Sequence, residues 1–233
     1  MQKLFYYQHF RHMLRLASYI PNHSTIKNII FDFGGVICDL DISKTEQKFR
    51  EFGPSRPAAS DSAVSQAQRF QNLVEDLETG IIPPEKFRQE IRDNYVIPPS
   101  DDTINETWNA MLLNIPEKRI RLLENLRSHF RIFLLSNSNQ IHYKKYLRDF
   151  QLQTGYSDFN DLFEKAFFSF EIGLKKPGKE IFEFVLSKSR LNPAESIFID
   201  DTCENVEAAM SVGMIGFHLH NGTEINDLFI ETN

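Results

Sequence analysis

Five short apolar runs, none of which alternates with polar residues, constrain the fold of this chain more than any other feature. They are Ile29–Phe31, Ile132–Leu135, Ala166–Phe168, Ile197–Ile199 and Met214–Phe217. Strands that are apolar on both faces are typical of a parallel sheet covered by helices. Helical patterns separate the later runs, at Gln140–Phe150, Lys179–Ser189 and Cys203–Val212. This alternation predicts an α/β fold, with a Rossmann-like parallel sheet core and helices on both faces.

The interval between the first two runs is too long for a single crossover helix. It contains four helical patterns, at Thr45–Phe52, Ala63–Leu77, Pro84–Asp93 and Asp102–Leu113. Breaks rich in Pro, Gly and Ser separate them at residues 53–62 and 97–100. We therefore expect an N-terminal extension (residues 1–26), an α/β core domain (27–42 and 114–233) and an inserted all-helical cap domain (43–113).

The N-terminal extension is basic, since the first 31 residues contain Lys and Arg but no Asp or Glu. The segment Leu4–Leu16 is apolar with basic interruptions, and this pattern predicts a helix. Its apolar runs are too short for a signal-peptide core or a membrane span. We expect the helix to pack on the domain, with a transit peptide or a membrane-surface helix as the alternatives.

Charge and cysteine content restrict the partners of the chain. The 233 residues carry a formal net charge of −6, which offers no basic field for a nucleic-acid backbone. Two cysteines, Cys38 and Cys203, are too few for a disulfide framework and fit a reducing cytosol. We expect a cytoplasmic protein that binds a small phosphorylated metabolite, with neither nucleic acid nor membrane as partner. The sequence carries no signal for an oligomeric state.

Polar residues follow four of the five predicted strands. Asp32 follows the first strand, Ser136-Asn137 the second, Lys175-Lys176 lies beyond the third, and Asp200-Asp201 ends the fourth. Ligands of parallel sheets bind beyond the carboxyl ends of the strands, so we expect these side chains to meet. Clustered carboxylates repel one another unless a hard cation neutralises them, and oxygen ligands suit Mg²⁺. The set predicts phosphoryl transfer, with Asp32 as the nucleophile and a hydroxyl and a Lys ammonium on the phosphoryl oxygens.

In order and spacing these signatures resemble the haloacid dehalogenase-like (HAD) hydrolase superfamily over residues 27–220. The resemblance implies that Asp32 is the nucleophile and that Gly34 gives a backbone carbonyl to Mg²⁺. It implies that Asp200 and Asp201 hold the metal, with Asp201 the direct ligand and Asn205 a supporting polar residue. Ser136, Asn137 and Lys176 are the implied phosphate-binding residues, and Lys176 is preferred to Lys175 because the family pattern places Lys directly before Pro.

A finer resemblance is to helical-cap members that act on sugar phosphates, such as bacterial α-glucose-1-phosphate phosphatases. It is carried by Leu77–Ile81, Trp108–Met111 and Leu135–Asn139 followed by His142. Candidate substrate residues are Asp39, Asp41, Trp108, Asn109, Asn139 and His142. The alternative to substrate contact is cap packing for Trp108 and a purely structural role for His142.

One position departs from the pattern of most phosphatases in this superfamily. They have a second Asp two residues after the nucleophile, which acts as general acid and then base, whereas this chain has Gly34. Loss of such a group typically reduces the rate by about 10² to 10⁴. Three explanations follow: a leaving group that needs little protonation, such as a sugar 1-phosphate; a proton donor at Asp39, Asp41 or in the cap; or a weak catalyst.

The sequence thus predicts a Mg²⁺-dependent phosphatase for a small phosphorylated metabolite, in particular a sugar phosphate, acting through an aspartyl-phosphate. The second hypothesis is a catalytically silent HAD-like scaffold that binds a phosphorylated ligand or a protein. Carbon–halogen hydrolysis is a third, and the pair Asp200-Asp201 counts against it because that chemistry needs no Mg²⁺.

Overall fold

A five-stranded parallel sheet forms the centre of the molecule, in the order β4-β3-β2-β5-β6. The computed structural model describes residues 13–16, 24–53, 63–220 and 222–232. The sheet strands are β2 (Asn28–Phe31), β3 (Arg131–Ser136), β4 (Lys165–Phe168), β5 (Ser196–Asp200) and β6 (Ile215–His218). Each coincides with one predicted apolar run, so the predicted α/β fold and its parallel sheet are confirmed.

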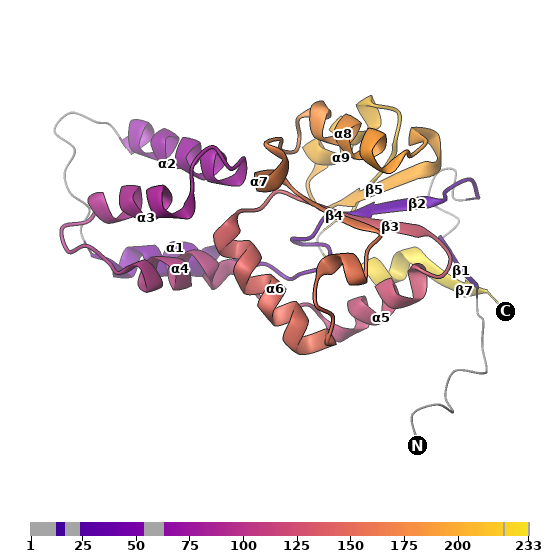
Figure 1. Ribbon diagram of the computed structural model, residues 1–233, viewed down its shortest axis with the longest axis horizontal. Coiled ribbons are helices and arrows are strands. Elements are labelled where there is room, and N and C mark those ends of the chain that lie inside the picture. Colours follow the sequence, from indigo (N-terminus) through magenta and orange to yellow (C-terminus); the bar gives the residue numbers. More distant parts are fainter. Residues whose placement is uncertain (1–12, 17–23, 54–62, 221, 233) are drawn as a thin grey trace, which may run out of the picture.

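Successive residues of each strand serve two different hydrophobic cores. Ile29 and Phe31 pack in the core that contains residues of α5 (Glu117–Leu126) and α6 (Gln140–Thr154). Ile30 faces the opposite side, in the core that contains residues of α8 (Lys179–Ser189) and α9 (Cys203–Ser211). Figure 1 shows these two helical layers on either side of the sheet. Burial on both faces explains why the strands are continuously apolar.

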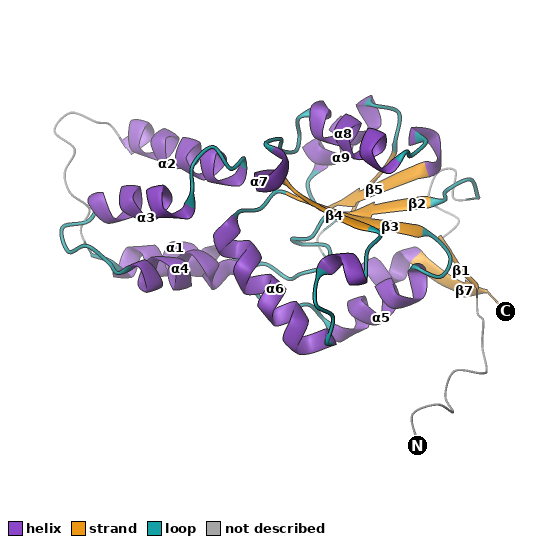
Figure 2. Cartoon of the chain, viewed as in Figure 1, coloured by secondary structure: helices purple, strands orange, loops and turns teal. Residues whose placement is uncertain are grey.

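The long interval after β2 folds into helices, as predicted. They are α1 (Ile42–Glu51), α2 (Ala63–Glu78), α3 (Pro84–Asp93), α4 (Asp101–Trp108) and the 3₁₀ turn η1 (Asn109–Met111). In Figure 2 they form a helical group beyond one end of the sheet. Leu77, Phe87 and Trp108 of this group belong to a third apolar cluster, which Ile141 of α6 also joins. The division into a core domain and a cap domain stays a prediction.

The two connections between the sheet and this helical group lie side by side. Leu40 and Leu112 form an antiparallel bridge. Next to it, the Asp39 N–H donates to the Asn114 carbonyl (3.1 Å), and the Leu113 N–H donates to the Asp39 carbonyl (3.0 Å). The helical group is therefore joined to the core through one short paired segment.

The N-terminal extension differs from the prediction. Residues Met13–Leu16 form strand β1, which pairs antiparallel with β7 (Phe229–Thr232) near the C-terminus. The predicted helix is therefore wrong for these four residues, because pairing with a distant strand overrides the local pattern. The rest of the predicted helix lies outside the described residues. In the part of the chain that the structure describes, we find no helix long and apolar enough to cross a membrane.

Candidate active site

Parallel register brings the predicted polar residues to one edge of the sheet. Phe31 of β2 pairs with Leu134 of β3 and with Ile199 of β5. The next residues along these strands therefore emerge at the same edge, and they include Asp32 and Asp200. The ends of these three strands thus converge as expected for a parallel sheet.

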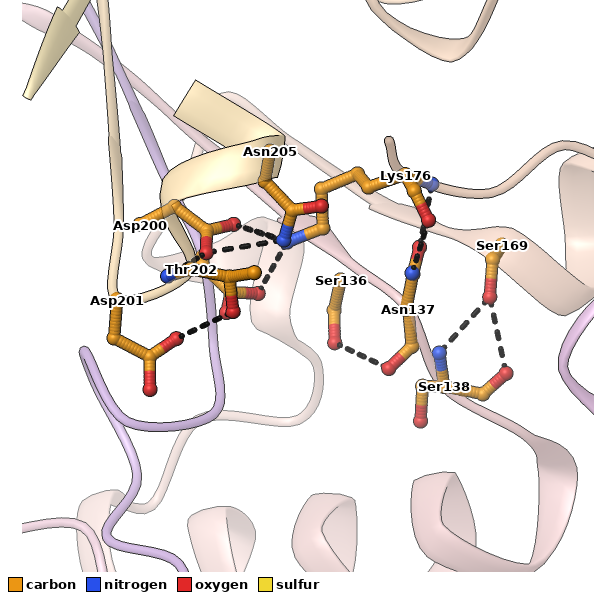
Figure 3. A network of polar contacts seen from close by, with 10 residues as sticks. Ser136, Asn137, Ser138, Ser169, Lys176, Asp200, Asp201, Thr202 and Asn205 are labelled. Atoms are coloured by element: carbon orange, nitrogen blue, oxygen red, sulfur yellow. Dashed lines mark hydrogen bonds and ion pairs between the residues drawn. The ribbon is translucent and has the colours of Figure 1, made fainter. Parts of the chain in front are cut away.

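Lys176 lies at the centre of this edge, between two carboxylates. Its Nζ is 2.7 Å from Asp32 Oδ1 and 2.7 Å from Asp200 Oδ2. The Lys176 side chain is 1% exposed and that of Asp200 is fully buried. Figure 3 shows Lys176 reaching across to Asp200 from the opposite side of the site. Neither a buried ammonium nor a buried carboxylate is stable alone, so the three groups depend on one another.

The loop that carries Lys176 is fixed by Asn137. The Asn137 Nδ2 donates to the Lys176 carbonyl (2.9 Å), and the Lys176 N–H donates to Asn137 Oδ1 (2.9 Å). The Ser138 N–H donates to Ser169 Oγ (2.9 Å) at the start of α7 (Ser169–Ile172). The Asn137 side chain therefore positions Lys176, and the predicted contact of Asn137 with a phosphate stays a prediction. Ser136 is buried beside it.

Three carboxylates offer oxygen atoms that all lie within 4.8 Å of one another: those of Asp32, Asp200 and Asp201. Asp200 also accepts hydrogen bonds from the Thr202 N–H (2.8 Å) and from Asn205 Nδ2 (3.0 and 3.1 Å). Asp201 is exposed, in contrast. Asp200 is therefore surrounded by protein donors, and Asp201 is the better placed of the two to bind a metal directly.

The carboxyl groups of Asp32 and Asp201 resist ionisation. Burial raises the pKa of Asp32, with Lys176 opposing the shift and Asp200 reinforcing it. Burial and the neighbouring Asp200 also raise the pKa of Asp201. One ammonium for three carboxylates leaves excess negative charge, which a hard divalent cation with oxygen ligands would neutralise. The donor set therefore fits the predicted Mg²⁺.

The turn after β2 explains why glycines follow Asp32. Gly35 has φ +73°, and a Cβ there would lie 2.0 Å from Asp201 Oδ2, so only glycine fits. A Cβ at Gly34 would lie 2.6 Å from Cδ1 of Leu40, so this side chain fills the space where an acid would begin. The predicted metal contact of the Gly34 carbonyl stays a prediction.

Asp39 and Asp41, the predicted alternative proton donors, have other partners. Asp39 Oδ1 accepts from Nη1 of the buried Arg119 (2.8 Å). The Ser43 hydroxyl donates to Asp41 Oδ1 (2.5 Å) at the start of α1. These contacts hold both carboxylates in the connection to the helical group, so the structure does not bring either to Asp32 by a direct contact.

The other four substrate candidates meet where the helical group contacts α6. The Trp108 and His142 rings are stacked, with centroids 5.1 Å apart and an interplanar angle of 9°. His142 Nδ1 is 2.9 Å from Asn109 Oδ1 and donates to it, since that oxygen only accepts. Asn139 Oδ1 caps α6 by accepting from the Ile141 and His142 N–H groups (both 3.1 Å). These residues form a buried junction, and their predicted contacts with substrate stay a prediction.

His142 is expected to make folding stability depend on pH. Burial lowers its pKa from 6.5 to about 3, so between these values the unfolded chain binds a proton that the folded protein does not. Stability is therefore lost as the pH falls through 6.5, and His142 accounts for a loss of about 2 kcal/mol between pH 7 and 5. Urea unfolding at both pH values measures it.

The matched variant is His142→Phe, which keeps a ring on Trp108 but cannot titrate. Its unfolding free energy should fall less than that of the wild type between pH 7 and 5, by about 2 kcal/mol. Equal pH dependence of the two proteins would contradict the burial of a neutral His142.

One residue near the site was not singled out by sequence reasoning. Glu78, the last residue of α2, pairs with Lys175, whose Nζ lies 3.2 Å from Glu78 Oε2. In the sequence, the stretch Leu77–Ile81 carries only a family resemblance. The sequence offers no further signal for Glu78, because a partly exposed lysine such as Lys175 is solvated by water and needs no acidic partner.

One comparison with protein families shows which family this chain belongs to. The model of the haloacid dehalogenase-like hydrolases matches residues 26–213. The chain belongs to this family. The predicted hydrolase class is thereby confirmed. Among curated HAD relatives, a D-ribitol-5-phosphate phosphatase of Bacteroides thetaiotaomicron is 28% identical over 85% of this chain and 94% of its own length. A sesquiterpene phosphatase of Aspergillus oryzae is 27% identical over 84% of this chain and 91% of its own.

Solved structures agree with this membership. A HAD family enzyme from Bacteroides thetaiotaomicron, crystallised as a magnesium complex, has a TM-score of 0.78 and 31% identity, over 88% of this chain and 98% of its own. The same enzyme with magnesium and inorganic phosphate has a TM-score of 0.76 over 87% of this chain and 98% of its own. The magnesium in these relatives agrees with the cation that suits the carboxylates of Asp32, Asp200 and Asp201.

Proposed function

We propose that this HAD-like hydrolase is a Mg²⁺-dependent phosphatase that releases inorganic phosphate from a small phosphorylated sugar or sugar alcohol, with Asp32 as the nucleophile. The observation that carries the proposal is the position of Lys176, whose Nζ lies 2.7 Å from both Asp32 and Asp200. An ammonium at this place orients the Asp32 carboxylate and offers donors to a phosphoryl group bound against it.

The reaction uses groups at three strand ends. An oxygen of Asp32 attacks phosphorus, the bond to the leaving oxygen breaks, and an aspartyl-phosphate forms. Lys176, the Ser136 hydroxyl and the Asn137 N–H donate to the equatorial oxygens, on which charge accumulates in the transition state. Water then attacks phosphorus and regenerates Asp32.

Asp32, Asp201 and the Gly34 carbonyl are the proposed metal ligands, with Asp200 behind them. When bound, Mg²⁺ supplies positive charge that reduces the repulsion between Asp32 and the phosphate dianion. Removal of the metal with EDTA is therefore expected to abolish phosphate release, and added Mg²⁺ to restore it.

The leaving group distinguishes two substrate classes. A sugar 1-phosphate has an acidic anomeric oxygen and tolerates the absence of an acid at Gly34, which favoured this class from the sequence alone. A sugar-alcohol 5-phosphate, the substrate named for the bacterial relative, leaves as a primary alkoxide and needs a proton. The overall likeness to that relative favours sugar-alcohol phosphates, provided that the chain supplies a proton from elsewhere.

The helical group at residues 43–113 is the proposed cap domain, and it determines which substrates enter. Its apolar cluster and its single paired connection to the core support this role. Asn109, His142 and Asn139 lie at the junction of cap and core and are proposed to respond to substrate through the position of the cap.

The test is a phosphate-release screen with and without Mg²⁺. Its substrates are pentitol and hexitol phosphates, both anomers of sugar 1-phosphates, and a prenyl phosphate, since one relative acts on a sesquiterpene. Mg²⁺-dependent release from sugar or sugar-alcohol phosphates is the expected result. Binding of these compounds without turnover would overturn the proposal in favour of a silent scaffold.

A further inference from the structure

Glu78 brings a carboxyl group from the proposed cap to the loop that carries Lys175 and Lys176. It ends α2, and its side chain is 23% exposed in an ion pair with Lys175 (3.2 Å). Glu75, one turn earlier, is more exposed at 47% and lies 3.7 Å from the same ammonium. Figure 1 shows the end of α2 approaching α7, next to the sheet.

The contact between α2 and the core is close at this point. Gly80 has φ +69°, and a Cβ there would lie 2.3 Å from the carbonyl oxygen of Phe170 in α7. Ser169, the preceding residue, bonds to Ser138 in the loop after β3. The end of α2 is therefore placed against the same loops that form the site.

Adjacent residues of one loop connect Glu78 to the nucleophile. Lys175 pairs with Glu78, while Lys176 pairs with Asp32. The positive charges of Lys175 and Lys176 both act on the Glu78 carboxyl group. Lys175 and Lys176 are consecutive residues, so the ion pairs of the Glu78 carboxyl group and of the nucleophile begin at neighbouring positions of one loop.

The other acids near the connection are already engaged. Gly34 has no side chain, and Leu40 fills the adjoining space. Asp39 is paired with Arg119, and Asp41 accepts from Ser43. Glu78, in contrast to these two acids, contacts the loop that carries Lys175 and Lys176.

We propose that Glu78 is the proton carrier of the reaction, in place of the Asp that is absent at position 34; this inference rests on the phosphatase function proposed above. As Asp32 bonds to phosphorus and the bond to the leaving oxygen breaks, the Glu78 carboxyl group gives its proton to that oxygen. In the second step the resulting carboxylate takes a proton from the attacking water. Phosphate leaves, and both carboxyl groups return to their starting states.

The surroundings of Glu78 suit both halves of this cycle. Burial raises its pKa, Lys175 and Lys176 oppose the shift, and Glu75 on the same helix adds to it. A phosphate dianion bound at Lys176 raises the pKa further and keeps the proton in place before reaction. Once the proton is transferred, Lys175 stabilises the carboxylate that remains.

The experiment compares Glu78→Gln with wild-type enzyme on two substrates of different leaving group. On ribitol 5-phosphate, kcat/KM is expected to fall by about 10² to 10³, since the alkoxide loses its proton donor. On p-nitrophenyl phosphate, kcat/KM should change by less than about threefold, because nitrophenolate leaves without a proton. Slowed hydrolysis of the aspartyl-phosphate should then give a burst of one nitrophenol per enzyme.

Glu75→Gln is the matched control, since it lies on the same helix near the same ammonium, and it should retain both activities. An equal loss of kcat/KM on both substrates in Glu78→Gln would overturn the proposal and identify a residue that only positions the cap. Unchanged activity on ribitol 5-phosphate would overturn it as well. If the wild-type enzyme releases phosphate from none of the sugar and sugar-alcohol phosphates in the screen, the proposed function itself fails. If the wild type is active and Glu78→Gln loses activity equally on both esters, only the role of Glu78 fails.

Discussion

Replacing Asp32 with Asn is expected to reduce phosphate release by at least about 10³-fold, the scale on which loss of a reacting group acts. Asn has nearly the same shape but is not a nucleophile for phosphorus, so no aspartyl-phosphate forms. The loss should be the same for alkyl and aryl phosphates, because attack on phosphorus is common to both. Rapid quench with ³²P-labelled substrate measures the covalent intermediate, which should be absent in the variant.

The same variant should fold at least as stably as the wild type in the absence of metal. Burial raises the pKa of Asp32 above its value in the unfolded chain, so the folded wild type loses stability as the pH rises from about 4 toward neutrality. The amide of the variant does not titrate, and the pair between Lys176 and Asp200 remains. Retained activity, or a lower thermal midpoint at pH 7, would contradict the placement of a reactive carboxylate in this cluster.

Replacing Lys176 with Met is expected to reduce both stability and activity. The change leaves Asp32 and the fully buried Asp200 without their shared cation, and breaking a buried pair from one side costs about 3 to 5 kcal/mol. Activity should fall by about 10² or more, because a donor to the phosphoryl oxygens is lost. Chemical unfolding and kcat/KM measure the two effects.

Magnesium distinguishes loss of charge from loss of packing in this variant. Because the uncompensated carboxylates bind a cation more tightly, Mg²⁺ should raise the thermal midpoint of Lys176→Met more than that of the wild type. Lys175→Met is the matched control, since the Lys175 side chain is 28% exposed, and the stability of this variant should change by less than about 1 kcal/mol. Equal stabilities of the two variants would show that Lys176 does not neutralise buried charge.

The sheet and the polar residues at its edge were predictable because burial on both faces makes each strand a continuously apolar run. Such a run can be recognised in the local sequence without knowledge of the neighbouring strands. The runs around Ile30 and Phe198 show it, and the polar residue after each run then marks the site. The N-terminal strand was not predictable, because Met13–Leu16 acquires its conformation from residues more than two hundred positions later. Local pattern carries no information about such a partner.

The residues on the cap side of the site were harder to predict from the sequence for a related reason. Trp108 and His142 are ordinary apolar and helical residues in the sequence, and only packing of the cap on α6 stacks their rings. Glu78 likewise looks like a solvated residue at a helix end until α2 is placed against Lys175. Residues that follow buried strands can be recognised from the sequence, whereas residues delivered by a separate helical group depend on how that group docks.

The side-by-side placement of Lys175 and Lys176 has a consequence for how such enzymes diversify. Lys175 is paired with Glu78 of the proposed cap and Lys176 with Asp32, the proposed nucleophile, so two consecutive residues link the fit of the cap to the chemistry of the core. A cap transplanted from another enzyme would bring no carboxylate for Lys175 unless the last turn of its helix at the position of α2 also carried an acid. New specificities in this lineage are therefore expected to arise by changes within the existing cap more readily than by exchange of whole caps.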